Sequence, residues 1–442
     1  MLRRYGGGDN HPVTLADRLA PPRLGRDFRW IWGSSASSNL GDGIVLAAGP
    51  LLVASITREP LAVAMAAFLQ QVPWLLFGIP AGAIIDRVDR RLLTVVVDLI
   101  RFLVIGSLSV AILTDWVSLP VVLATFFLLG TAETFADNAA PTLVATAVPK
   151  DGLGVANSRL FATSIVGNQL AGPPLGAFLF GVGLAVPFGV NALCFLLAAV
   201  LVSRISTPVV ERAGEPRAMR HEIAEGVRWL WAHAPMRTLV LTITAFNVTF
   251  GAAMAVYVLY AVERLGLGEI GYGLLLTMSA VGGLLGAATY RWLEQRFSLA
   301  DLMRIGLVIE TLTHLGLALT REPLVAGAIM VLFGLHAVVW GTTSTTVRQR
   351  AVPGHLLGRV TAVYLLGGVG GLAAGSLLGG LIAQQWGVVG PYWFGFVGSA
   401  LLTALMWRAL AHIAHAAEVG PGGRAGDPAP DDGRPSAGPA RD

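Results

Sequence analysis

The chain has 442 residues, of which 54% are hydrophobic and only 13% charged, with a net charge of +4 and a mean hydropathy of +0.67. Soluble domains carry about 25% charged residues, so this composition excludes a soluble globular enzyme and indicates a membrane protein. The single lysine, Lys150, is followed by Asp151, which excludes a P-loop ATPase, and the arginines are dispersed between apolar runs, which argues against nucleic-acid binding.

In chain order, a polar arm comes first and lacks the apolar core of a signal peptide. Apolar segments of about 20 residues follow, the length that a membrane-spanning helix needs. We expect twelve spans, at 31–55, 61–83, 92–113, 118–140, 156–180, 184–203, 237–262, 270–292, 300–319, 323–343, 359–384 and 388–411. The sequence therefore predicts an all-α membrane protein with six spans on each side of a central polar interval.

The polar intervals divide the chain into five expected parts. Part of the central interval, 219–231, has an amphipathic pattern, which predicts either a helix at the membrane surface or a connecting helix packed on the bundle. The tail is rich in Gly, Pro and Asp, which predicts disorder. The expected parts are an N-terminal arm (1–29), an N-terminal six-helix bundle (30–204), a central cytoplasmic loop (205–236), a C-terminal six-helix bundle (237–412) and a tail (413–442).

The distribution of basic residues predicts the orientation of these spans. With the N-terminus placed inside, all but three of the 31 basic residues fall on the cytoplasmic side, and the exceptions are Arg58, Arg264 and Arg321. Cytoplasmic loops carry an excess of Lys and Arg, so we expect both termini in the cytoplasm of a bacterial cell, with the chain in its inner membrane.

An internal repeat supports two related halves. An offset of 204 positions aligns Gly82 with Gly286, and Gly167 with Gly371. The same offset matches the order of the spans, which indicates duplication and two pseudo-symmetric six-helix bundles. Such a duplication predicts a central cleft that opens to either side as the halves rock.

A charged motif lies between the second and third spans. It resembles motif A of the major facilitator superfamily, with Asp89 at the usual second glycine position; its residues are Gly82, Asp86, Arg87, Asp89, Arg90 and Arg91. The glycine is expected to let two helices approach closely. The resemblance implies that Asp86 caps a helix of the other half and forms a gating latch in one conformation. We assign Asp98, Arg101 and Asp137, near the same rim, to this latch.

The fifth span carries a second motif, Gly167-Asn-Gln-Leu-Ala-Gly172-Pro173-Pro-Leu-Gly176. It resembles motif C of the superfamily, which marks exporters, although Ala177 replaces one glycine of the closing pair. The alternative interpretation is a generic kinked helix. The arginine of motif B is missing from the fourth span, which has Glu133, Asp137 and Asn138 instead.

The chain from about 24 to 411 resembles the macrolide-efflux and enterobactin-exporter-like branch of the superfamily. The resemblance rests on Ser38-Asn-Leu-Gly-Asp42, the charged loop after the second span, and Val352-Pro353 followed by Gly358-Arg359-Val360. It implies a major facilitator fold of twelve transmembrane helices in two six-helix bundles, and transport of a small molecule.

Carboxyl groups inside the spans are candidates for proton coupling, because a buried ionised group is costly and desolvation favours its neutral form. Asp42 lies near the expected midplane, and we assign it and Glu133 to proton coupling. Alternatively, Asp42 forms hydrogen bonds to neighbouring helices. Glu310 and His314, one turn apart in the ninth span, are a less favoured proton relay. The expected substrate cleft contains Asn39, Asn247, His336 and Trp340, each of which has packing as its alternative.

The leading hypothesis is proton-coupled export of a small amphiphilic drug-like or secondary-metabolite molecule by a monomer. The alternatives are a lipid or lysophospholipid translocator, or an importer of the same fold; a membrane enzyme or receptor is the least favoured. The lone Cys194 and the scattered histidines predict no metal site and no cofactor.

Overall fold

The computed structural model describes residues 24–85, 88–206 and 219–410, and within these ranges the chain is helical and contains no strand. The first half contains α2 (Arg26–Ile56), α3 (Pro60–Ile85), α4 (Arg90–Leu113), α5 (Leu119–Ala147), the continuous segment α6 (Leu153–Ser164), η3 (Ile165–Ala171) and α7 (Gly172–Val182), and α8 (Val186–Val202). The second half contains α9 (Met219–Ala232), α10 (Ala234–Ala255), α11 (Tyr257–Leu259), η4 (Tyr260–Arg264), α12 (Glu269–Arg296), α13 (Leu299–Leu319), α14 (Pro323–Ala351), α15 (Leu357–Trp386) and α16 (Gly390–Met406).

Ten helical segments among the described residues are long and apolar enough to cross a membrane, and α8 is a shorter apolar helix. With α16, which has 17 residues, every expected span coincides with a helix. Helices satisfy their own backbone hydrogen bonds, which a bilayer requires of any segment that crosses it. The predicted all-α membrane fold is therefore confirmed.

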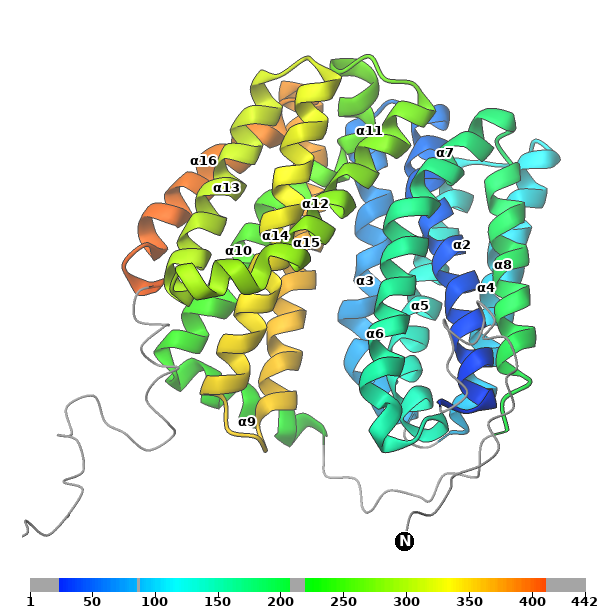
Figure 1. Ribbon diagram of the computed structural model, residues 1–442. Coiled ribbons are helices and arrows are strands. Elements are labelled where there is room, and N and C mark those ends of the chain that lie inside the picture. The colour runs from blue at the N-terminus through cyan, green and yellow to red at the C-terminus, as the bar shows by residue number, and fades with distance from the viewer. Residues whose placement is uncertain (1–23, 86–87, 207–218, 411–442) are drawn as a thin grey trace, which may run out of the picture.

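Two groups of helices form the two halves of the molecule (Figure 1). They contact each other mainly through α3 with α15 and α7 with α12, and to a smaller extent through α12 with η3 and α2, α3 with α10, and α2 with α11. Glycines permit close approach at both: a Cβ on Gly273 would lie 2.7 Å from the Pro173 carbonyl oxygen, and one on Gly380 would lie 3.0 Å from the Leu61 Cα. Because neither site can hold a larger residue unless the neighbouring helix moves, these glycines determine how closely the two halves pack.

Aligned glycines of the internal repeat occupy equivalent positions in the two halves. Gly167 packs against the backbone of α2 at Asn39 and Leu40, and Gly371 packs against the backbone of α10 at Thr244. The first helix of each half thus contacts the fifth at the same point of the repeat. This equivalence is the structural counterpart of the sequence duplication.

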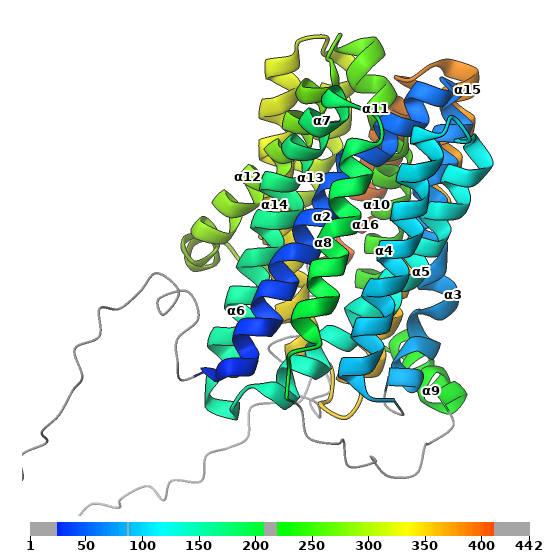
Figure 2. The same cartoon turned by 90° about the vertical axis from the view of Figure 1, so that its right-hand side faces the viewer.

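The hydrophobic core shows that the halves meet at one end only. One buried cluster joins both halves and includes Leu52, Phe188, Tyr257 and Tyr392. It lies toward the loops at 57–59, 183–185 and 320–322, which we call the closed end. At the opposite, open end each half has a core of its own, and the ribbons of the two halves diverge there (Figure 1). Figure 2, turned by 90°, shows the helices of the first half in front of those of the second.

The central amphipathic segment forms α9, which packs on the second half at the open end. Leu230 is fully buried there, Glu225 forms an ion pair with Arg359, and Gly226 lies against Arg359 as well. Val227 and Trp231 stay exposed. Of the two interpretations from sequence, α9 is a connecting helix packed on the bundle, with part of its apolar face left uncovered.

Candidate functional site

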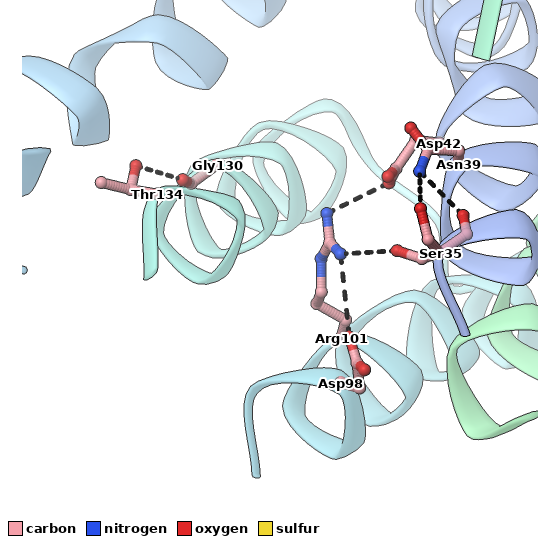
Figure 3. Close-up of polar contacts among 8 residues, drawn as sticks. Ser35, Asn39, Asp42, Asp98, Arg101, Gly130 and Thr134 are labelled. Carbon is pink, nitrogen blue, oxygen red and sulfur yellow. Dashed lines mark hydrogen bonds and ion pairs between the residues drawn. The ribbon is translucent and has the colours of Figure 1, made fainter. Parts of the chain in front are cut away.

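Arg101 is the centre of a buried ionic cluster in the first half (Figure 3). It projects from α4 and is only 3% exposed. Its guanidinium lies 3.1 Å from Asp42 of α2 and 3.8 Å from Asp98, one turn earlier on its own helix. It also donates to the Ser38 hydroxyl at 3.2 Å and lies over the Phe195 ring at 4.3 Å. One arginine therefore ties α2, α4 and α8 together.

Two further carboxyl groups, Glu133 and Asp137, face this cluster from α5. They line a cavity of 320 Å³ together with Asp42, Arg101 and Trp74 of α3. The remaining lining residues are Val45, Leu46, Gln70, Gln71, Leu129, Asn168, Asn191, Phe195 and Val369. We call this space the acidic cavity.

The charges around the acidic cavity do not balance. Arg101 interacts electrostatically with Asp42, Glu133, Asp98 and Asp137, so one cation faces four carboxyl groups. Asp98 is buried, Asp42 and Glu133 are half-buried, and Asp137 is exposed. Full ionisation would therefore leave an excess of negative charge in a partly buried space, where it is less favourable than in water. The cluster therefore favours binding of protons or of a cationic group.

A second and larger cavity lies between the halves. It measures 510 Å³, and its walls are mainly apolar side chains of α2, α3, α5, α10, α11, α12, α14 and α15, among them Phe126, Phe250, Tyr257 and Phe333. We call it the apolar cavity. Both cavities are lined by Gln70, Gln71 and Asn168, so they adjoin. An apolar space with a few amides and a charged group at one side suits an amphiphilic ligand.

The glycine-rich motif of the fifth span packs against two helices at once. Gly172 and Gly176 touch the backbone of α2 at Gly43 and Ile44, at distances that leave no room for a side chain. Residues Ile165–Ala171 form a π-helix, a rare conformation often found at functional sites. The Leu170 carbonyl there accepts a hydrogen bond from Thr277 of α12 at 3.4 Å. Motif C is thus a contact between the halves as well as a contact within one.

The motif A residues lie at the open end, and the structure describes only part of them. Asp86 and Arg87 lie outside the described residues. Asp89 caps α4 by accepting from the backbone N–H of Arg91 and Leu92, and Arg91 donates to the Ser203 carbonyl. No described atom lies within 4 Å of a Cβ on Gly82, so the close helix approach expected there is not found. A close approach of two helices occurs instead at Gly130 of α5, which packs against the Gln70 carbonyl of α3.

Several predicted site residues lie elsewhere than expected. Arg101 and Asp137, which the sequence assigned to the latch, line the acidic cavity with Asp42 and Glu133. Asp98, also assigned to the latch, pairs with Arg101 at 3.8 Å and does not line the cavity. His336 is buried against Glu310, and Trp340 belongs to the core of the second half. Neither lines the acidic or the apolar cavity, because their sides of α14 face α13 rather than the first half.

The two predicted cleft amides also have partners within the helical bundles. Asn39 donates to the Ser35 carbonyl at 2.7 Å, and Asn247 packs at the crossing of α10 with α15, beside Gly371. Neither belongs to the lining of the two cavities. Sequence reasoning missed Gln70, Gln71 and Asn168, which do line them. The adjacent glutamines in an otherwise apolar span were the available signal.

Comparisons with known proteins agree with this architecture. The family described as transmembrane secretion effectors, within the major facilitator superfamily, matches residues 16–421. The multidrug efflux pump Tap of Mycolicibacterium fortuitum is 28% identical over 371 residues, covering 78% of this chain and 87% of the relative. Macrolide efflux protein A of Streptococcus pyogenes is 24% identical over 397 residues, covering 85% and 93%.

Solved structures with the same fold are transporters. A point mutant of the nucleoside transporter NupG superposes with a TM-score of 0.73 at 9% identity, covering 88% of this chain and all of that one. A bacterial homologue of the iron transporter ferroportin, in an inward-facing state, gives 0.72 at 16% identity, covering 87% and 98%.

The chain is a multi-pass secondary transporter with the major facilitator fold, and it belongs to the transmembrane secretion effector family. It is therefore a transporter of a small molecule and not an enzyme. Within the described residues, no group of three or more His, Cys, Asp or Glu is arranged to hold a metal ion.

Proposed function

We propose that the chain exports a small amphiphilic molecule, of the drug-like or secondary-metabolite kind, in exchange for protons. The observation that carries this proposal is the junction of the acidic and apolar cavities at Gln70, Gln71 and Asn168. A ligand in the apolar cavity lies next to the unbalanced carboxyl groups. Binding there changes the electrostatics of the cluster and so displaces a proton.

Within this proposal, Asp42 is the principal proton-binding group and Glu133 the second. Asp42 is the carboxyl closest to Arg101, at 3.1 Å, so protonating it removes the partner of a buried guanidinium. That change frees α4 from α2 at the level of the cavity. Asp98 and Asp137 then become the remaining anions near Arg101, and the arginine exchanges partners rather than being left alone.

The direction of export rests on the motif C resemblance and on the named efflux relatives. The orientation rests on the positive-inside rule, which places both termini in the cytoplasm of a bacterial cell and the chain in its inner membrane. With that orientation the open end faces the cytoplasm, as expected for an exporter ready to take up its cargo. We further propose that the monomer is the transporting unit.

The test is transport by the purified protein in lipid vesicles that contain a pH-sensitive dye. A proton gradient is imposed, and erythromycin, ethidium and a lysophospholipid are added in turn. Proton movement that depends on erythromycin or ethidium supports the proposal. Transport of either compound without proton movement would replace antiport by facilitated diffusion, and movement of the lysophospholipid alone would favour the lipid translocator.

A further inference from the structure

A second buried group of titratable side chains lies in the other half, away from both cavities. Glu310 and His314 are one turn apart on α13, and His336 faces them from α14. The His336 Nε2 lies 2.8 Å from one Glu310 carboxyl oxygen, and the His314 Nε2 lies 3.5 Å from the other. All three are at least nine-tenths buried. We call them the histidine triad.

Among the described residues, the only charged or titratable groups that interact with Glu310 are the two histidines of the triad, His314 and His336. From α16, the backbone at Gly395 packs directly on the His314 ring. The remaining ionisable side chains of the surrounding helices do not interact with Glu310; they are Arg237, Glu269, Tyr272, Tyr290, Arg291, Glu294, Arg296, Asp301, Arg304, Arg348, Arg350, Arg359, Tyr364 and Tyr392.

An isolated carboxylate in this setting requires a compensating positive charge. If both imidazoles were neutral, Glu310 would be an uncompensated buried anion, which costs several kcal/mol in proteins. One added proton makes the triad neutral as a whole. The 2.8 Å contact between His336 and Glu310 has the length of a charge-assisted N–H···O bond. His314 lies farther from Glu310, at 3.5 Å, and its two ring nitrogens and the His336 Nδ1 form no hydrogen bond.

An aromatic pair connects the triad to the apolar cavity. Phe333 meets the His336 ring edge-on, with ring centres 5.5 Å apart. On its other side it stacks on Phe250 at 4.9 Å, and both phenylalanines line the apolar cavity. A ligand that moves Phe333 therefore changes the packing of the imidazole that holds Glu310.

We propose that Glu310, His314 and His336 form a second proton-binding site, in which the two imidazoles hold one added proton and neutralise the Glu310 carboxylate. The site lies one aromatic ring behind the wall of the apolar cavity. The site is distinct from the acidic cavity, since the two belong to different halves. It goes beyond the proposed function, and its test requires neither transport nor a substrate.

The test uses nitrogen-15 NMR of histidine in the full-length protein in lipid nanodiscs, because imidazolium and neutral imidazole give different ring signals. The six other histidines are replaced by glutamine or asparagine so that every signal comes from the triad; they are His11, His221, His233, His355, His412 and His415. Glu310→Gln is compared with Glu294→Gln, a control that removes a carboxyl from the end of α12.

At pH 7 we expect one imidazolium per molecule, either shared by the two rings or held by one of them. The imidazolium signal should disappear in Glu310→Gln and remain in Glu294→Gln. Two neutral rings at pH 7 in the protein that retains Glu310 would overturn the proposal, and so would an imidazolium that survives Glu310→Gln. If Glu310→Gln does not assemble, the spectrum of the protein that retains Glu310 decides by itself. A negative result leaves the vesicle experiment on proton-coupled transport unaffected, so the two proposals fail separately.

Discussion

The two halves hold their buried charges in opposite ways. Around the acidic cavity one arginine faces four carboxyl groups, and the group opens onto space that a ligand can enter. The histidine triad has one carboxyl between two imidazoles and lines neither the acidic nor the apolar cavity. An unbalanced group next to a cavity is suited to exchange protons with a ligand, whereas a balanced group in a closed core is suited to hold one. The duplicated fold has thus acquired different chemistry in each half.

The largest expected effect comes from neutralising the carboxyl closest to the arginine. Asp42→Asn removes the titrating group but keeps its shape, so we expect proton-driven ethidium transport in vesicles to fall about 5- to 150-fold, the usual range of coupling between sites. Exchange of ethidium without a gradient should persist. Asp301→Asn, an exposed carboxyl on α13, is the control and should transport normally. Full proton-driven transport by Asp42→Asn would remove Asp42 from the mechanism.

Removing the arginine itself tests how strongly the acidic cluster depends on one cation. Arg101→Ala leaves four carboxyl groups without their partner, and losing one member of a buried pair costs about 3–5 kcal/mol. Thermal unfolding in detergent should show this loss. Arg350→Ala breaks an exposed 3.9 Å pair with Glu294 and should cost below about 1 kcal/mol. Equal effects of the two substitutions would contradict the central position given to Arg101.

The contact between the halves can be loosened without touching either charged group. A side chain at Gly273 would collide with Pro173 and Ala177 of α7, so Gly273→Val should destabilise the closed end by about 1–3 kcal/mol. Spin labels at Glu59→Cys and Glu322→Cys, with Cys194→Ser, should report longer distances across that end. Gly181→Val on α7 is the control, since no atom lies within 4 Å of its Cβ. Unchanged distances would show that Gly273 does not determine closure.

The smallest expected effect concerns His233, which precedes α10 outside the membrane span. Burial lowers the pKa of His233, and its Nδ1 accepts a hydrogen bond from the Met236 N–H at 3.4 Å. Because the pKa of His233 is lower in the folded state, neutral His233 contributes its full stabilisation of the fold above the unfolded pKa of about 6.5. It is lost as the pH falls through the folded pKa. The melting temperature of wild type should therefore fall more between pH 7 and pH 5 than that of His233→Asn, which keeps a capping group. Identical pH profiles would rule out this contribution.

Much of the fold was predictable, because a bilayer limits the chain to apolar helices of nearly fixed length. The spans and the duplication follow from periodic properties of the sequence. Asp42 was found in the same way, as a charge where apolar residues are expected. These predictions need only the position of a residue along its own helix.

The partners of each charged group were not predictable, because they depend on how the helices are rotated relative to one another. Arg101 is three positions from Asp98, and the sequence assigned both to the latch. It missed Asp42, the partner of Arg101 that lies 59 positions away. His336 was expected in the cleft, but the rotation of α14 turns it to Glu310. The apolar cavity draws its walls from both halves, and no single helix carries that information.

The most direct test of the account is proton release when a ligand binds to the purified protein. Ethidium is added to the protein in weakly buffered detergent solution with a pH-sensitive dye, and bound ligand and released protons are counted. Reciprocal linkage between adjoining sites predicts release of about one proton per bound ethidium in wild type and none in Asp42→Asn. Binding of ethidium to wild type without proton release would contradict the claim that the acidic and apolar cavities act together.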